Sequence, residues 1–389
     1  MSSICMETGF VSLIKKGEEL CGDRVATVNG EDCCTLVLAD GLGSGVKANI
    51  LSTLTAKIIA TMMSNGLSVE ECVSTIAQTL PVCKVRQIAY CTFTILQVST
   101  NGDAYLVQFD NPAAILLRDG QSVDYDQTQK VICGKTIYES RFKVRVGDLF
   151  LLMSDGVIHA GVGEVLNFGW QRENVVEYAQ EKYAPDISAK AMAAVICEAC
   201  RDLYLNKPGD DTTVAALKVR RRQVVNLMIG PPADKRDDET MMQQFFSKGG
   251  KRIVCGGSTS QMVSRYLNKP IRCSIDYADP EIPPTAAIDG VDLVTEGVIT
   301  IGKVLETARG FSSENDVSLR FQNKKDGASL ISQLLFEEAT DVNFFVGKAV
   351  NPSHQNPNLP ININIKMELI QNLADCLSKM GKRVKVNFY

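Results

Sequence analysis

The chain has 389 residues, of which 45% are hydrophobic and 22% are charged, and its formal net charge is −4. This is an ordinary globular composition of two-domain length, and the weakly acidic balance disfavours nucleic acid as a partner. No apolar stretch approaches the roughly 20 residues that cross a bilayer, and no export signal is visible, so we expect a cytoplasmic protein with no membrane partner and with thirteen reduced cysteines.

The first half of the sequence reads as blocks of strands and blocks of helices. Apolar runs predict strands at residues 10–14, 25–28 and 35–39, and apolar residues at helical spacing predict helices after Gly45 and over 69–80. Further strands are expected at 89–98, 104–109, 113–117, 142–146, 149–153 and 214–219, with a hairpin turn at Asn101-Gly102 and helices over 174–183 and 188–205. Strands in such blocks predict antiparallel α+β layers.

Beyond Arg222 strands and helices alternate. Strands are expected at 224–229, 252–255, 271–275, 291–295, 342–346 and 383–388, and helices at 241–246, 263–267, 301–308, 328–339 and 366–380. Alternation predicts an open, parallel α/β sheet of the Rossmann-like kind. We therefore expect a first domain over 1–220 and a second over 223–389, the second having a ligand-binding or regulatory role.

Acidic residues recur beside glycines at the ends of the predicted strands of the first domain. They are Asp23, Asp40, Asp155, Asp210 and Asp211, next to Gly22, Gly41, Gly156 and Gly209. Clustered carboxylates suit Mg²⁺ or Mn²⁺, and two such ions can direct a water onto phosphorus. The absence of histidine from this set disfavours zinc. Each aspartate alone could instead be an ordinary turn residue.

The motifs Asp40-Gly-Leu-Gly-Ser-Gly-x-x-Ala48, Met153-Ser-Asp-Gly156 and Gly209-Asp-Asp-x-Thr-Val214 resemble those of the metal-dependent serine/threonine protein phosphatases. This family is also called PPM or protein phosphatase 2C-like, and the similarity is greatest to its bacterial SpoIIE-type branch. The segment Asn111–Gly120 also resembles that branch. The resemblance covers about residues 1–220 and implies a four-layer α-β-β-α sandwich that hydrolyses phosphoserine or phosphothreonine on a protein.

The resemblance also implies roles for individual residues. Asp40 would bridge two Mn²⁺ or Mg²⁺ ions, with the Gly41 carbonyl on one of them. Asp23, Asp155 and Asp210 would complete the second, and Asp211 would hold a weaker third ion or orient waters. Asp40, Asp155 and Asp210 are thus the expected catalytic residues.

The sequence departs from the family pattern at some positions. Leu42 stands where many eukaryotic relatives have a histidine after Asp-Gly, and Asp110-Asn111 replaces the histidine that is usual before the proline. Arg24 is a candidate for binding phosphate. His159 is a candidate proton donor, with a simple helix-start residue as the alternative.

Two further motifs each allow a functional and a purely structural interpretation. Gly256, Gly257, Ser258 and Thr259 lie between a predicted strand and a predicted helix, where backbone amides can bind an anion. A plain turn with a serine N-cap is the alternative. Cys197 and Cys200 form an isolated CxxC on a predicted helix, which favours buried structural thiols over a zinc or redox site.

Together these observations predict a phosphatase with a C-terminal regulatory or targeting domain. Its expected partners are a phosphoprotein substrate and a small-molecule ligand of the second domain, and a homodimer is left open. The alternative is a binding or signalling module with a phosphatase fold, whose second domain binds a nucleotide or another small anion.

Overall fold

The computed structural model describes residues 4–30, 32–79, 91–273, 283–313, 326–349 and 362–389. The chain divides into two compact units, Met1–Arg221 and Arg222–Tyr389. Residue 80 of the expected helix 69–80 and the ends of the expected strands 89–98 and 271–275 lie outside the described residues. Within these ranges no helix is both long and apolar enough to span a membrane.

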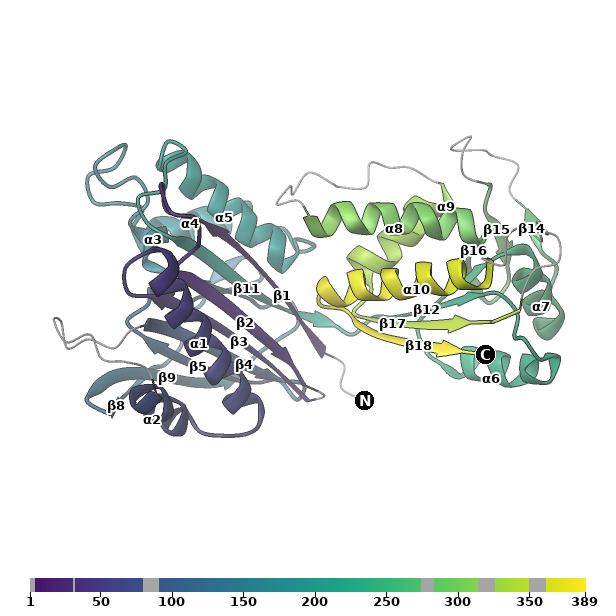
Figure 1. Cartoon of the computed structure of the whole chain (residues 1–389), viewed down its shortest axis with the longest axis horizontal. Helices are drawn as coiled ribbons and strands as arrows, with labels where there is room; N and C mark the ends of the chain where they lie inside the picture. Colours follow the sequence, from purple (N-terminus) through teal and green to yellow (C-terminus); the bar gives the residue numbers. More distant parts are fainter. Residues whose placement is uncertain (1–3, 31, 80–90, 274–282, 314–325, 350–361) are drawn as a thin grey trace. The chain divides into compact units, whose positions relative to one another are not determined.

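The first unit contains two antiparallel sheets (Figure 1). One has the order β2-β3-β4-β5-β9-β8 and consists of β2 (Asp23–Asn29), β3 (Cys33–Gly41), β4 (Cys91–Ser99), β5 (Asp103–Phe109), β9 (Lys135–Lys143) and β8 (Thr128–Ile132). The other has the order β1-β11-β10-β6-β7 and consists of β1 (Ile4–Leu13), β11 (Thr212–Arg221), β10 (Leu149–Met153), β6 (Ile115–Arg118) and β7 (Gln121–Ser122). The first unit is therefore a mixed α+β domain, as predicted.

Three hydrophobic clusters hold these layers together. The first lies between the two sheets, and the second lies between the six-stranded sheet and helices α1 (Gly45–Ser64) and α2 (Val69–Thr79). The third packs the five-stranded sheet against α4 (Arg172–Lys182) and α5 (Ala189–Leu203), with the short α3 (Asp155–Ile158) at its end. The order of layers is thus helix, sheet, sheet, helix.

The uninterrupted apolar runs are explained by strands that are buried on both faces. In β3, Leu36 and Leu38 face the other sheet, whereas Val37 and Ala39 face α1 and α2. Successive side chains of a strand point to opposite faces. Asp40, two residues after Leu38, therefore continues the face that looks into the space between the sheets.

The second unit is built on one seven-stranded sheet of the order β14-β15-β16-β13-β12-β17-β18. Its strands are β12 (Val224–Ile229), β13 (Lys251–Cys255), β14 (Arg272–Cys273), β15 (Ala286–Ile288), β16 (Val291–Thr295), β17 (Asp341–Val346) and β18 (Arg383–Phe388). Pairs among β16, β13, β12, β17 and β18 are parallel, as predicted. The edge made by β14 and β15 is antiparallel, so the sheet is mixed rather than wholly parallel.

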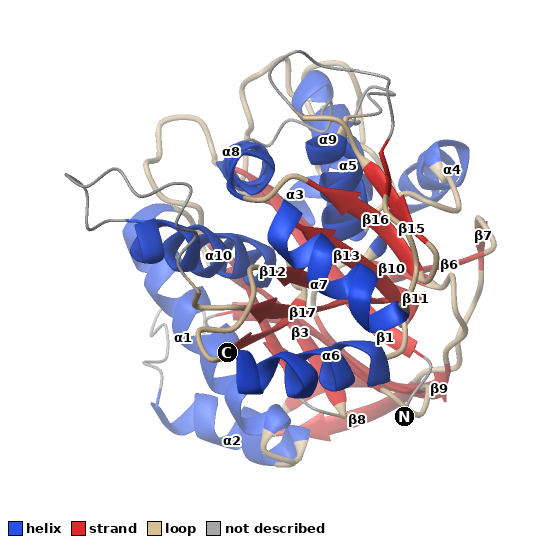
Figure 2. Ribbon diagram, turned by 90° about the vertical axis from the view of Figure 1, so that its right-hand side faces the viewer, coloured by secondary structure: helices blue, strands red, loops and turns tan. Residues whose placement is uncertain are grey.

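Helices cover both faces of this sheet (Figures 1 and 2). On one face lie α8 (Val298–Ser313), α9 (Gly327–Ser332) and α10 (Asn362–Lys379), and on the other lie α6 (Asp238–Ser247), preceded by the 3₁₀ turn η1 (Lys235–Asp237), and α7 (Gly257–Leu267). The single helix expected over 328–339 begins as α9 and continues as the π-helical segment η2 (Gln333–Glu338).

Candidate metal centre

Two of the predicted carboxylates come from adjacent strands of the six-stranded sheet. Asp23 begins β2, Asp40 lies near the end of β3, and the two residues are directly paired in the antiparallel register. Asp23 is only 4% exposed, and neither of its carboxylate oxygens has a hydrogen-bond partner among the described residues. Burying an ionised carboxylate without hydrogen-bond partners costs folding free energy. The burial of Asp23 therefore needs an explanation other than stability.

The other carboxylates come from the five-stranded sheet. Asp155 follows β10 and begins α3, and Asp210 and Asp211 precede β11. These two strand ends are joined because the Ser154 amide donates to the Thr213 carbonyl and the Thr213 amide donates to Ser154 Oγ at 2.8 Å. The structure therefore brings both acidic motifs to one end of neighbouring strands.

The pKa shifts indicate that the carboxylates from the two sheets lie close to one another. Burial, followed by the charges of Asp23 and Asp155, raises the pKa of Asp40 to about 9. Burial raises the pKa of Asp23 to about 7, and the neighbouring Ser154 and Thr213 partly oppose that rise. The pKa of Asp155 is raised by burial and then by the charge of Asp210. Acidic groups far apart along the chain thus repel one another in the fold.

The glycines beside these aspartates allow backbones to approach closely. A Cβ atom at Gly156 would lie 2.2 Å from the Asp211 carbonyl oxygen, and one at Gly41 would lie 2.4 Å from the Ala48 carbonyl oxygen. Neither position has room for a side chain. In the pairs Asp40-Gly41 and Asp155-Gly156, the residue after the aspartate must therefore be glycine, because any other residue would carry a Cβ atom that does not fit.

Asp211 differs from the other four in its hydrogen bonds. Its Oδ1 accepts from the Lys15 amide at 3.0 Å and its Oδ2 accepts from the Gly22 amide at 2.8 Å. Asp211 is also buried, at 4% exposure. Its carboxylate therefore closes the loop between β1 and β2 in this structure, whereas the sequence predicts a role with a third ion or with waters.

Divalent cations fit the chemistry of this donor set. The oxygens are carboxylates, which hard cations prefer, and Asp23 contributes two buried oxygens without partners. As the side chains stand, however, the described residues contain no group of three or more His, Cys, Asp or Glu side chains arranged to hold a metal ion. Ligation would therefore require the side chains to move toward a bound ion.

The two candidates for phosphate binding and proton donation are placed differently. Arg24 is exposed and follows Asp23 in β2, so its side chain lies on the opposite face of the strand, away from the carboxylates. His159 Nδ1 lies 4.0 Å from Asp155 Oδ2, and the imidazole is 54% exposed. His159 follows α3 as its C-cap and does not begin a helix.

Sequence reasoning assigned no role to Lys15, Ser154, Thr213 or Tyr204. Lys15 Nζ lies 3.6 Å from Asp210 Oδ1, and the buried Tyr204 hydroxyl donates to the Gly156 carbonyl at 2.7 Å. Ser154 lies in the motif Met153–Gly156 and Thr213 lies in the motif Gly209–Val214, so these two motifs could have indicated that both residues belong to the site. Nothing in the local pattern pointed to Lys15 or Tyr204.

In the second unit, the predicted anion motif lies where β13 ends and α7 begins. Gly256 has φ of 102° and is the N-cap residue of α7, and its amide donates to the Thr295 carbonyl. The Thr259 hydroxyl is buried and accepts from the Gly230 amide at 2.9 Å. Thr259 is thus occupied in joining two loops, while Gly257 and Ser258 supply the first-turn amides.

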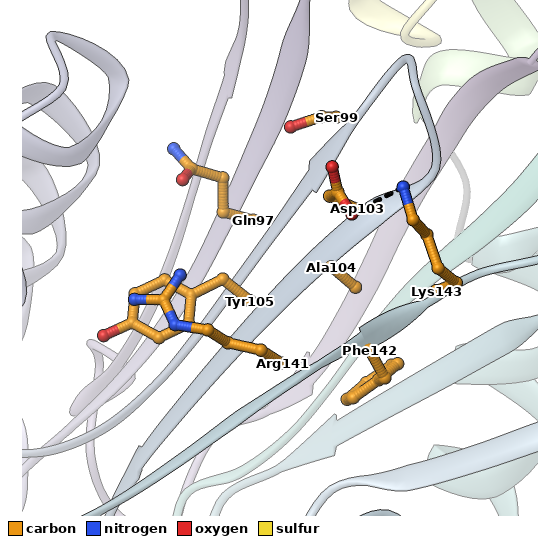
Figure 3. A pocket seen from close by; sticks show the side chains of 8 residues that line it. All are labelled: Gln97, Ser99, Asp103, Ala104, Tyr105, Arg141, Phe142 and Lys143. Carbon is orange, nitrogen blue, oxygen red and sulfur yellow. Dashed lines mark ion pairs between the residues drawn. The ribbon is translucent and has the colours of Figure 1, made fainter.

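The cysteine pair and a surface hollow lie apart from this chemistry. Cys197 and Cys200 are buried free thiols in α5, and burial raises the pKa of Cys197 to about 12. A hollow of about 340 Å³ lies over β4, β5 and β9 (Figure 3). There the Arg141 guanidinium lies 3.8 Å from the Tyr105 ring centre, and Lys143 pairs with Asp103. None of the five carboxylates lines it.

Comparison with known proteins identifies the first unit. The family model described as Stage II sporulation protein E (SpoIIE) matches residues 30–220, and no curated protein sequence gives a significant match.

Three solved structures illustrate the structural similarity. One is the structure of the phosphatase domain and a fragment of the regulatory domain of SpoIIE from Bacillus subtilis. It is 18% identical to this chain with a TM-score of 0.49, and the match covers 57% of this chain and 66% of that one. The RsbU and RsbW domains of a Mycobacterium tuberculosis protein are 18% identical to this chain with a TM-score of 0.46, and the match covers 61% of this chain and 66% of that one. RsbX, solved in complex with magnesium, is 19% identical with a TM-score of 0.41, and the match covers 55% of this chain and 95% of that one. On the family match, residues 30–220 of the first unit form a SpoIIE-type, PP2C-like phosphatase domain.

Proposed function

We propose that the first unit is a metal-dependent phosphatase that hydrolyses phosphoserine or phosphothreonine on a protein. The observation that carries this proposal is the convergence of acidic residues from two sheets, in which the pKa of Asp40 is raised to about 9 by burial and by the charges of Asp23 and Asp155. Such mutual repulsion is relieved when cations bind between the carboxylates. The SpoIIE family match supports the same reaction.

In this proposal Asp23, Asp40, Asp155 and Asp210 hold two Mn²⁺ or Mg²⁺ ions together with the Gly41 carbonyl. Asp211 would take up a third ion only by giving up its hydrogen bonds from the Lys15 and Gly22 amides. When bound, paired cations supply a water nucleophile and neutralise phosphate oxygens. The protein itself contributes the buried surroundings of Asp23 and the pairing of Ser154 with Thr213, which holds the ends of the neighbouring strands β10 and β11 together. His159, next to Asp155, is the candidate donor of a proton to the leaving group.

Replacing Asp40 tests the proposal directly. Hydrolysis of p-nitrophenyl phosphate and of a phosphoserine peptide is measured on the full chain with Mn²⁺. Because loss of a residue that merely supports a metal ligand already costs about 10–100-fold, we expect Asp40→Asn to lower the rate by more than about a hundredfold.

Asp103→Asn is the matched control, because Asp103 is an exposed aspartate of the β5 hairpin paired with Lys143. It should leave the rate unchanged. Wild-type protein without Mn²⁺-dependent hydrolysis, or an Asp40→Asn variant as active as wild type, would refute the proposal and favour a non-catalytic binding module.

We also propose that the second unit is a Rossmann-like regulatory domain that binds a small anion, such as the phosphate of a nucleotide, at the start of α7. Two features support this. The strand order reverses between β12 and β17, because β13 and β16 lie on one side of β12 and β17 and β18 lie on the other, and ligands bind at such a reversal in open α/β sheets. The start of α7 is next to this point, since Thr259 accepts a hydrogen bond from the amide of Gly230, which follows β12. The first turn of α7 carries no acidic residue, so its amides and dipole favour an anion.

A pair of charge variants tests this second site. Ser258→Asp puts a negative charge in the first turn of α7, whereas Gln261→Asp puts the same charge on an exposed position further along the same helix. Melting temperature is measured with ATP, NAD⁺ and inorganic phosphate. We expect at least one of them to raise the Tm of wild type and of Gln261→Asp but not of Ser258→Asp, since only ligands of the native state stabilise it. No rise in wild type with any of the three would contradict the proposal.

A further inference from the structure

We propose that the exposed apolar side chains of the loop between α3 and α4 form a docking surface for the protein substrate of the first unit, an inference that rests on the proposed phosphatase function. This loop runs over residues 159–171 (Figure 1). The occupant that the surface fits is an uncharged, apolar segment beside the phosphoserine or phosphothreonine of that protein.

Both ends of this loop lie at the carboxylate cluster. At its start, His159 Nδ1 lies 4.0 Å from Asp155 Oδ2. The far end returns to the same place, because a Cβ atom at Gly169 would lie 3.1 Å from His159 Cα and 2.4 Å from the Ile158 carbonyl oxygen. A protein that brings its phosphate group to Asp155 must therefore also approach this loop.

Backbone hydrogen bonds within the loop fix its shape. The Val162 amide donates to the His159 carbonyl at 3.1 Å, and the Leu166 amide donates to the Gly161 carbonyl at 2.9 Å. Gly161 has φ of 82°, a conformation that favours glycine, and Leu166 packs against the core beneath. A surface that is already held in one conformation loses little conformational entropy when a partner covers it.

Three apolar side chains of the loop face the solvent. Phe168 is 82% exposed, Val165 is 51% exposed and Val162 is 49% exposed. They belong to one small surface, because Val162 Cγ2 would lie 2.9 Å from a Cβ atom at Gly169, and Val165 Cγ2 would lie 3.1 Å from one at Gly161. Single exposed apolar residues are ordinary on a protein surface, whereas clustered ones indicate an interaction site. An aromatic residue in such a cluster is typical of the anchor of an interface.

The charge of the loop indicates the chemistry of the partner. Glu164 is the only ionisable residue between residues 160 and 171. The loop therefore offers no cation to an acidic residue of the substrate, and Glu164 repels one. An apolar segment gains free energy by burial against Phe168 and the two valines. Because a small aryl phosphate carries no such segment, the docking surface affects the hydrolysis of protein substrates alone.

The experiment compares Phe168→Ser, Val165→Ser, Phe168→Leu and Val131→Ser in the full chain loaded with Mn²⁺. Val131→Ser is the control matched to Val165→Ser, because Val131 is a 65% exposed valine of β8, at the opposite edge of the six-stranded sheet from β2 and β3. We measure kcat/KM for p-nitrophenyl phosphate and for two phosphoserine peptides of equal length. One peptide has leucine at the three positions on either side of the phosphoserine, and the other has glutamine there.

We expect wild type to prefer the leucine peptide about tenfold, and Phe168→Ser to remove this preference, a loss at the low end for truncating an anchor residue. Val165→Ser should reduce the preference in part. The rates with the glutamine peptide and with p-nitrophenyl phosphate should stay within about threefold of wild type. Phe168→Leu, which keeps an apolar side chain, and Val131→Ser should both retain the preference.

A binding measurement provides a readout that does not depend on turnover. The leucine peptide is labelled with a fluorophore and carries a phosphonate in place of the phosphate ester, so that it cannot be hydrolysed. Its Kd is measured by fluorescence anisotropy, and Phe168→Ser should raise that Kd about tenfold.

The inference is overturned if wild type hydrolyses both peptides equally well, or if Phe168→Ser lowers the rates with all three substrates to the same extent, because Phe168 would then only support the fold of the site. A wild-type dimer that Phe168→Ser dissociates would also overturn it, since the loop would then join two copies of the chain. Wild-type protein inactive on all substrates would instead refute the proposed function, and the Kd of the phosphonate peptide alone would then decide whether the loop binds an apolar segment.

Discussion

At the scale of single residues, Asp23 is the most informative side chain of the first unit. It is 4% exposed, and both its oxygens are buried without hydrogen-bond partners among the described residues. Burial raises its pKa from 3.8 to about 7. The fold therefore holds a carboxyl group that binds its proton more tightly in the folded chain than in the unfolded one, which is a destabilising feature once that proton is lost.

This shift predicts how the stability of the metal-free protein depends on pH. Between about pH 4 and pH 7 the unfolded chain has released the Asp23 proton while the folded chain keeps it, so the free energy of unfolding falls as pH rises. Because the pKa of Asp40 is raised to about 9, the fall in the free energy of unfolding continues up to about pH 9. Each proton contributes a slope of at most about 1.4 kcal/mol per pH unit.

Asp23→Asn removes the titrating group, so the variant should lose less stability than wild type between pH 5 and pH 8, by a few kcal/mol at most. Urea unfolding of EDTA-treated protein at the two pH values measures this. Asp103→Asn is the control, because the lowered pKa of Asp103, caused by its hydrogen bond from Lys143, places its titration below this range. Identical pH slopes for wild type and Asp23→Asn would count against the buried-acid account.

At the scale of elements, the parts predicted well are those whose burial pattern is simple. β3 and β10 are buried on both faces and appear as continuous apolar runs, and the Asn101-Gly102 turn joins β4 to β5 as expected. In contrast, β8 is exposed at four of its five residues, so it carries neither an apolar run nor alternation. The short β15 near the sheet edge has the same weakness.

The site shows a similar division. Local pattern was enough to place Asp23, Asp40, Asp155 and Asp210 at strand ends beside glycine. The hydrogen bond from the Lys15 amide to Asp211, by comparison, joins residues 196 positions apart. A contact of that separation depends on β1 pairing with β11, and no local pattern in a single sequence specifies it. The interactions missed were those created by the pairing of distant strands.

At the scale of the whole molecule, the two units have separate cores. The cluster between the two sheets of the first unit includes Leu38 and Phe150, whereas the clusters of the second unit draw on β12, β13, β16 and β17 and their helices. Among the described residues, each hydrophobic cluster takes all its members from one unit. Cooperative unfolding follows the packed core, so the units should unfold as separate transitions.

Helix caps offer a way to identify each transition by calorimetry. Ser188 caps α5 by accepting from the Ala191 amide, and Asp326 caps α9 by accepting from the Ser329 amide. Loss of such a cap costs about 1 kcal/mol, or a few degrees in Tm for units of this size. Ser188→Ala should therefore lower one transition and Asp326→Ala the other, and Mn²⁺ should raise only the transition that Ser188→Ala lowers. A single transition lowered equally by both variants would show that cooperativity crosses the boundary at Arg221–Arg222, and the regulatory role proposed for the second unit would then act through shared folding stability.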